Sequence, residues 1–210
     1  MYHINAKGWT PIFNIFGQAG VDKVLPSKEY IEMLSAVSFA DLDLQDGEGW
    51  SCVHRAAAYG TADDIATLKR MHASISLRTQ CLLWTPIFCA VQFGNVATFL
   101  ELANCQPSIW TARDVRGWTL LHVAVNAKHA EIVRLLIQGG ADPHVQSAAT
   151  KFFVPEDLKG LSVTPGDIAR RRGSDDFFAY INALKETGYK FELVENEIND
   201  LPDVFWPALS

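Results

Sequence analysis

The chain has 210 residues, a formal net charge of −6, and a composition in which 49% of the residues are hydrophobic and 20% are charged. These proportions are ordinary for a soluble, packed protein. The negative charge provides no electrostatic footprint for nucleic acid, and no apolar run approaches the roughly 18 residues that a membrane span needs.

Two further features bear on the compartment. Residues 1–5 lack the basic-then-apolar layout of a signal peptide. The four cysteines stand at irregular spacing, and we interpret them as reduced thiols. We therefore expect a cytoplasmic or nuclear protein. The cysteines are Cys52, Cys81, Cys89 and Cys105.

The first predicted helical unit opens at Trp9-Thr10-Pro11. Thr10 is placed to cap a helix, and Pro11 suits its first turn. The helix expected over 12–16 is apolar on more than one face, whereas the end of a repeat array normally turns a polar side to water. Two explanations stay open: loop 21–28 and the lead-in fold over this face, or upstream repeats of a longer chain or a partner cover it.

Later units begin at the same kind of dipeptide. Trp50-Ser51, Trp84-Thr85 and Trp118-Thr119 follow one another at intervals of 34 residues. Each is followed by a short apolar segment and then by a second helical pattern. In the most regular unit, residues 117–145, two such helices are separated by a polar break and closed by a glycine pair. Helices this short cannot bury their apolar faces alone, so each unit needs neighbours.

The spacing changes after residue 145. From Thr119 to Thr164 is 45 residues, about a dozen more than a repeat period near 33. The excess predicts an enlarged loop over 146–161 on the binding side. A fifth, more polar unit starts at Thr164-Pro165 and suits a capping repeat. The acidic tail 188–210 is expected to be extended, with its aromatic pair packed on the last repeat rather than free as a linear motif.

These units resemble the ankyrin repeat family. The resemblance rests on three sequence features: the period near 33, the Thr-Pro-x-(His/Phe)-x-Ala pattern, and the Gly-Ala-Asp sequence at 140–142 that ends a unit. The tail resembles, more weakly, the ends of ankyrin proteins from filamentous fungi. The resemblance implies an all-α solenoid of about five helix-turn-helix repeats with short turn fingers. Their approximate bounds are 8–40, 47–75, 80–106, 114–145 and 160–187, within a repeat domain of 1–187.

The resemblance also implies that residues varying between units face a partner. The recurring tryptophans have two interpretations: an amphipathic strip suited to binding, or indoles that pack on the next repeat and stiffen the array. Phe93 and Tyr59, at the ends of successive inner helices, would extend such a strip into a groove. The candidate partner-binding residues are Glu48, Trp50, Tyr59, Trp84, Gln92, Phe93, Arg116, Trp118 and Asn126, with Ala58, Val115 and Ala127 at comparable positions.

Candidate chemistry is sparse. His54 and His122 are expected to hydrogen-bond the turn rather than bind metal, because zinc needs three or four converging ligands. Cys52 stands at a predicted helix start, yet no base accompanies it, so we expect a packed residue. The run Arg170-Arg171-Arg172 is expected to solvate a helix end, with pairing to the acidic tail as an alternative.

The sequence therefore predicts a non-catalytic module that binds a protein partner through its inner-helix face and finger loops, without cofactor, metal, nucleic acid, membrane or small-molecule substrate. A second hypothesis is that the chain is the C-terminal ankyrin segment of a larger signalling, sensor or scaffold protein and serves autoinhibition or assembly. A third, weaker hypothesis is an enzyme whose chemistry lies in loop 146–161. Fold alone does not name the partner.

Overall fold

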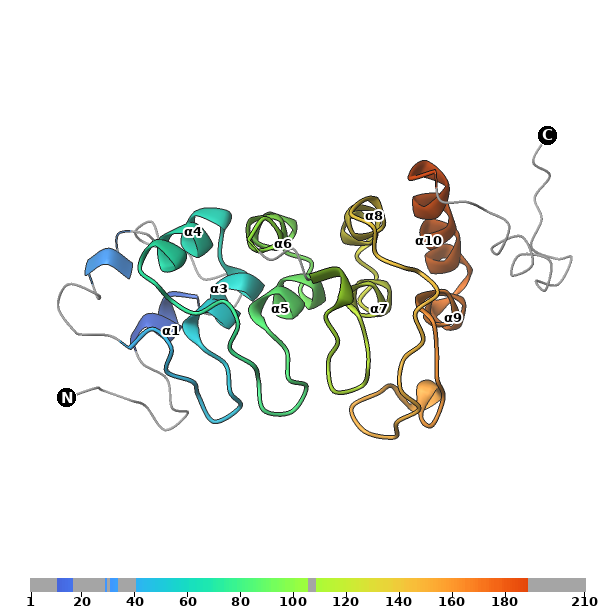
Figure 1. Cartoon of the computed structure of the whole chain (residues 1–210), viewed down its shortest axis with the longest axis horizontal. Coiled ribbons are helices and arrows are strands. Elements are labelled where there is room, and N and C mark those ends of the chain that lie inside the picture. The colour runs from blue at the N-terminus through green and yellow to red at the C-terminus, as the bar shows by residue number, and fades with distance from the viewer. Residues whose placement is uncertain (1–10, 17–28, 30, 34–40, 106–108, 189–210) are drawn as a thin grey trace, which may run out of the picture.

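The computed structural model describes residues 11–16, 29, 31–33, 41–105 and 109–188. Its helices stand in two rows along one axis, and loops project from the inner row on one side (Figure 1). The inner row comprises α1 (Pro11–Ile15), α3 (Cys52–Tyr59), α5 (Pro86–Gln92), α7 (Leu120–Asn126) and α9 (Pro165–Arg172). The outer row includes α4 (Ala62–Arg70), α6 (Val96–Ala103), α8 (Ala130–Gln138) and α10 (Ser174–Glu186). Two single-turn 3-10 helices are η1 (Ile109–Thr111) and η2 (Glu156–Leu158).

Each inner helix packs against the next one in the chain. Contacts run from α1 to α3, then to α5, α7 and α9. In the outer row α4 packs against α6, and α8 packs against α10. From α3 to α10, each helix also contacts its partner within its own unit. The expected all-α stack of paired helices is therefore confirmed, and burial of one unit depends on its neighbours.

The inner helices begin where the sequence predicts. Ser51, Thr85, Thr119 and Thr164 are the N-cap residues of α3, α5, α7 and α9. Pro86 and Pro165 occupy the first turn, where a missing N–H has no cost. Pro11 likewise opens α1, while Thr10 lies outside the described residues. The N-cap residues and first-turn prolines expected from the sequence are thus found at the starts of these helices.

The loops that precede the inner helices, here called fingers, are stacked by backbone hydrogen bonds. Gln80 N–H donates to the Glu48 carbonyl at 3.0 Å, Val115 N–H to the Leu82 carbonyl at 3.2 Å, and Ala148 N–H to the Arg116 carbonyl at 2.9 Å. Glycine is required at two finger positions. Gly49 and Gly117 have φ angles of +81° and +71°, and a Cβ there would lie 2.7 Å and 2.8 Å from backbone nitrogens of the next finger.

The enlarged loop is an insertion within the last finger. Its ends meet where Ser147 N–H donates to the Val163 carbonyl at 2.9 Å, and Val163 N–H donates to Ser147 Oγ at 3.0 Å. Leu158 of η2, which is part of this loop, is buried. Arg172 pairs with the Asp157 carboxylate at 3.2 Å, and Arg171 donates to the Asp157 carbonyl. The arginine run therefore lies in the last turn of α9, as expected, and two of its members hold this loop.

A core of buried apolar side chains runs from the first unit to the last. Ile12, Phe13 and Phe16 are buried at one end, and Phe177 and Leu184 at the other. None of the described helices combines the length and apolar character that crossing a bilayer requires. The predicted tail contact falls in residues 189–210, outside the described residues.

Candidate partner-binding surface

The recurring tryptophans do not share one environment. Trp84 is 7% exposed and Trp118 is 1% exposed, whereas Trp50 is half-buried. Trp9 lies outside the described residues. The strip of stacked, accessible indoles is therefore not formed by units three and four. There the structure favours the alternative interpretation, in which the indole packs inside the array.

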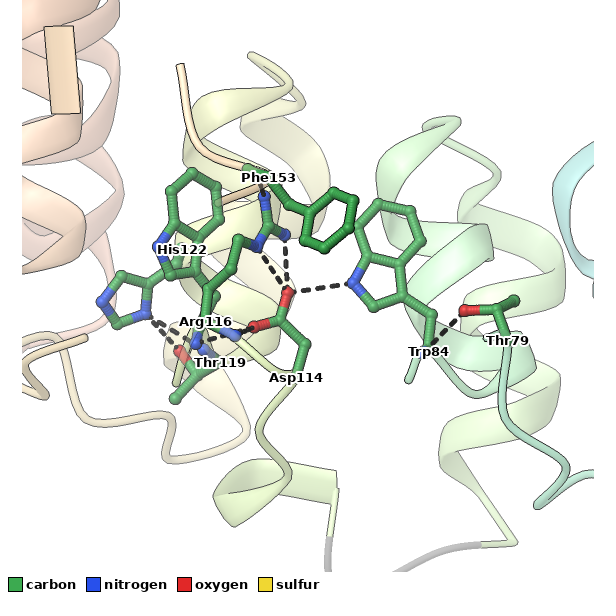
Figure 2. Close-up of polar contacts among 8 residues, drawn as sticks. Thr79, Trp84, Asp114, Arg116, Thr119, His122 and Phe153 are labelled. Atoms are coloured by element: carbon green, nitrogen blue, oxygen red, sulfur yellow. Dashed lines mark hydrogen bonds and ion pairs between the residues drawn. The ribbon is translucent and has the colours of Figure 1, made fainter. Parts of the chain in front are cut away.

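A buried ion pair explains where these two indoles lie. Asp114 Oδ2 accepts hydrogen bonds from Trp84 Nε1 at 3.0 Å and from Arg116 at 2.8 Å (Nε) and 2.6 Å (Nη2) (Figure 2). Its other oxygen, Oδ1, accepts from the Arg116 and Trp118 backbone N–H groups at 2.8 Å and 3.0 Å. One carboxylate thus joins the indole of unit three to the finger of unit four.

Arg116 also connects this finger to the enlarged loop. Its Nη1 donates to the Phe153 carbonyl at 3.0 Å, and its guanidinium lies 3.8 Å from the centroid of the Trp118 ring. Burial lowers the pKa of Arg116, while Asp114 opposes that shift. Figure 2 shows the Phe153 ring on the side toward the Trp84 indole. Buried pairs of this kind fix one geometry strongly, since removal of either partner strands a charge.

Three of the predicted contact residues are therefore interior. Trp84, Arg116 and Trp118 are each less than a tenth exposed, because Arg116 folds back on Asp114 and the loop covers it. We assign these three side chains to packing between repeats and leave them out of the accessible surface.

Another part of the predicted groove is assembled as a cluster. Phe93, at the end of α5, is 43% exposed. Its ring centroid lies 4.9 Å from that of Tyr59 and 6.2 Å from that of Trp50. Tyr59 is the last residue of α3 and Trp50 lies just before that helix, so two repeats contribute to one surface. We call Trp50, Tyr59 and Phe93 the Phe93 cluster. Arg55 lies 5.7 Å from the Trp50 ring centroid.

The remaining candidates are polar. The Glu48 side chain is exposed, and Gln92, next to Phe93, is half-buried. Asn126 is half-buried and already occupied, since its Oδ1 accepts hydrogen bonds from Arg172 at 2.9 Å and 3.1 Å. Among the comparable positions, Val115 is 48% exposed, whereas Ala58 is buried and Ala127 half-buried.

The two inner-helix histidines tie consecutive units together. Thr119 N–H donates to His122 Nδ1 at 3.2 Å, so the proton of the neutral ring is on Nε2, which donates to the Val163 carbonyl at 3.0 Å. His54 makes the same pair of contacts, with Ser51 at 3.1 Å and the Trp84 carbonyl at 3.0 Å. Burial lowers the pKa of both rings, that of His122 to about 4. The expected hydrogen bond to the turn is confirmed, and the link to the next repeat is an addition.

The side chains that were considered for catalysis all have structural partners. Cys52 is buried, its Sγ donates to the Leu42 carbonyl at 3.2 Å, and burial raises its pKa to about 12. In the enlarged loop, Glu156 pairs with Lys159 and Asp157 with Arg172. Among the described residues, no group of three or more histidine, cysteine or acidic side chains is placed to hold a metal ion.

Asp114 is the residue that organises this region and that the sequence analysis missed. Its signal is the pattern Asp-x-x-Gly-Trp, which occurs at 46–50 and again at 114–118. At 46–50, Asp46 Oδ1 likewise accepts from the Glu48 and Trp50 N–H groups, at 3.0 Å and 2.9 Å. An aspartate four residues before a recurring tryptophan therefore marks a turn whose carboxylate is used internally.

The described residues form a solenoid of stacked helix-turn-helix units, which defines a class of repeat protein. Residues 64–147 match the family model described as ankyrin repeats (3 copies). This part of the chain therefore consists of ankyrin repeats, which are typically protein–protein interaction modules.

Its curated relatives are much longer proteins. Alpha-latrotoxin-Lg1a of Latrodectus geometricus is 31% identical over 129 residues, covering 61% of this chain and 9% of the toxin. The 2-5A-dependent ribonuclease of Mus musculus is 40% identical over 67 residues, covering 31% of this chain and 9% of that protein. The nuclear factor NF-kappa-B p105 subunit of Gallus gallus is 29% identical over 153 residues, covering 70% of this chain and 15% of that protein. The similarity therefore concerns repeats, not whole proteins.

Proposed function

We propose that the chain is a non-catalytic module that binds a protein partner, with the Phe93 cluster as the centre of the contact. The observation that carries this proposal is an exposed phenylalanine whose ring contacts two aromatic side chains of the preceding repeat. Aromatic side chains supply large contact areas, and they dominate binding hot spots when polar residues surround them. Glu48 and Gln92 provide such polar neighbours along the chain.

The fingers supply a second accessible apolar surface. Leu83 is 40% exposed on the third finger, Val115 is 48% exposed on the fourth, and Phe152 and Phe153 are 75% and 56% exposed on the enlarged loop. We call these four residues the finger edge. Neighbouring fingers are joined through their backbones, so the edge is presented on a common support. Clustered exposed apolar side chains mark interaction sites more often than scattered ones do.

Leu83 adds a reason to assign function to this edge. Its φ angle is +56°, at the position where the fingers of units two and four have Gly49 and Gly117. A branched residue is strained there, and strain of this kind clusters at binding sites. The whole repeat region up to residue 187 is proposed to act as one binding domain. A cytoplasmic or nuclear location stays a prediction.

The proposal is tested with a peptide ligand selected from a displayed random library against the native chain. Selection is expected to favour the strongest hot spot, and affinity is then measured for variants. Phe93→Ala is expected to weaken the peptide at least about tenfold, equivalent to about 1.4 kcal/mol. Phe178→Ala is the matched control, because Phe178 is 41% exposed on outer helix α10.

The two phenylalanines have nearly equal exposure, so the comparison isolates position. Circular dichroism and thermal melting establish that both variants fold. If Phe178→Ala weakens the peptide as much as Phe93→Ala does, or neither variant has an effect, the inner-face assignment is wrong. A parallel Phe152→Ser variant reports whether the finger edge contributes.

A further inference from the structure

Three side chains from two repeats meet on the outer row of helices. Lys69 lies on α4, Glu101 on α6, and Cys105 just beyond the end of α6. Lys69 Nζ lies 2.7 Å from Glu101 Oε1 and 2.7 Å from Cys105 Sγ. The lysine and glutamate side chains are 27% and 28% exposed, and Cys105 is exposed. Solvent therefore reaches a thiol that touches an amine.

The nitrogen–sulfur separation is unusually short. Sulfur is larger than oxygen, so a hydrogen bond to a thiol is normally longer than one to a carboxylate. Here the two distances from Lys69 Nζ are equal. A separation this short is the one that a single oxygen atom bonded to both nitrogen and sulfur would impose. We propose that Lys69 and Cys105 form an oxidant-dependent covalent cross-link, Nζ–O–Sγ, between units two and three.

Two molecules of hydrogen peroxide supply the oxidant and the bridging oxygen for this cross-link. One molecule oxidises the Cys105 thiol to sulfenic acid and leaves as water. A second transfers oxygen to the neutral Lys69 amine, which gives a hydroxylamine and another water. The hydroxylamine oxygen then bonds to Sγ, and the sulfenic hydroxyl leaves with the hydroxylamine proton as a third water. Two molecules of peroxide are consumed, four electrons are removed from the pair, and the chain gains one oxygen and loses two hydrogens.

The contacts among Lys69, Glu101 and Cys105 determine the sequence of these steps. In the reduced pair, hydrogen bonds to Cys105 and then Glu101 raise the pKa of Lys69, so its ammonium form is stabilised. Oxidation of Cys105 Sγ removes the hydrogen bond that raises the pKa of Lys69 most. The Glu101 carboxylate, still 2.7 Å from Nζ, is positioned to accept the proton that the amine must lose. The amine therefore becomes reactive after the thiol has been oxidised.

The other cysteines are not equivalent. Cys52 and Cys89 are buried, and burial raises the pKa of both thiols, which disfavours the reactive thiolate. Cys81 is exposed like Cys105 but has no hydrogen-bond partner within the described parts of the chain. It is therefore the matched control for thiol exposure without a neighbouring amine.

The test uses the full chain treated with dilute hydrogen peroxide and analysed by intact and peptide mass spectrometry. We expect a mass gain of about 14 Da that is reversed by dithiothreitol and joins the Lys69 and Cys105 peptides. Lys69→Arg, which keeps the positive charge, and Cys105→Ser are expected to reduce the cross-linked fraction at least tenfold. Cys81→Ser is expected to leave it unchanged. Closing a loop between α4 and α6 should raise Tm by about 5 °C or more.

Other products overturn the proposal. Gains of about 16 or 32 Da confined to Cys105 would mean that the thiol oxidises alone. A loss of about 2 Da would indicate a direct nitrogen–sulfur bond without the bridging oxygen. Persistence of the gain of about 14 Da in Lys69→Arg would place the modification elsewhere.

Discussion

Two turns with the same sequence pattern, 46–50 and 114–118, are built alike and used differently. In each, an aspartate accepts hydrogen bonds from the N–H groups two and four residues later. In each, glycine takes a positive φ just before the tryptophan. Yet Trp50 remains half-buried and contacts Phe93, whereas Trp118 is 1% exposed.

The difference lies in one residue and one loop. The residue two positions before tryptophan is Glu48 in the first turn and Arg116 in the second. Glu48, an acid like Asp46, forms no ion pair with it and is exposed, whereas Arg116 pairs with Asp114 and stacks on Trp118. The enlarged loop then supplies a carbonyl to the guanidinium. A repeated motif therefore forms surface or interior according to what the next finger brings to it.

The largest effect is expected from the aspartates. Asp114→Ala leaves the Arg116 charge buried without its partner and removes the acceptor of the Trp84 indole, so we expect a loss of about 3–5 kcal/mol in unfolding free energy. Asp46→Ala removes turn hydrogen bonds and a longer 3.4 Å contact with Arg55, and we expect a loss of about 1–2 kcal/mol. Urea unfolding measures both. Equal losses would mean that the two turns do not differ in the proposed way.

A somewhat smaller effect is expected from acid. The pKa of His122 falls from 6.5 to about 4 in the folded state because the ring is buried. Between these values the unfolded chain binds more protons, so stability present above pH 6.5 is lost as pH falls toward 4, by about 3 kcal/mol from this group. His122→Phe, which places the residue type of Phe88 at this position, should flatten the pH dependence over that window. An unchanged slope in that variant would remove His122 as its source.

Contacts between residues that are close in the sequence could be predicted, whereas contacts between residues far apart in the sequence could not. Local signals were sufficient for the helices, because Thr119 as a cap and Pro165 in a first turn act within a few residues. The hydrogen bond from the turn to His122 was predicted for the same reason. Burial of Arg116 was not predictable, since it requires the carbonyl of Phe153, 37 residues away and within an insertion. The same holds for Lys69 and Cys105, which are 36 residues apart.

The smallest effect is expected at the third finger, which lacks the glycine found in the two compared turns. Leu83→Gly relieves the positive φ but increases the freedom of the unfolded chain, so stability should change by less than about 1 kcal/mol. Because Leu83 is exposed, its removal should weaken a partner that uses the finger edge. A stability loss above about 2 kcal/mol would show that the side chain is needed for packing.

Hydrogen exchange of the indole N–H groups tests the central claim most directly. Nitrogen-15 spectra resolve these signals, and single Trp→Phe variants assign them. The account predicts slow exchange for Trp84, whose Nε1 donates to buried Asp114, and for buried Trp118, with fast exchange for Trp50. Exchange of Trp84 and Trp118 as fast as that of Trp50 would contradict the division of these turns into interior and surface.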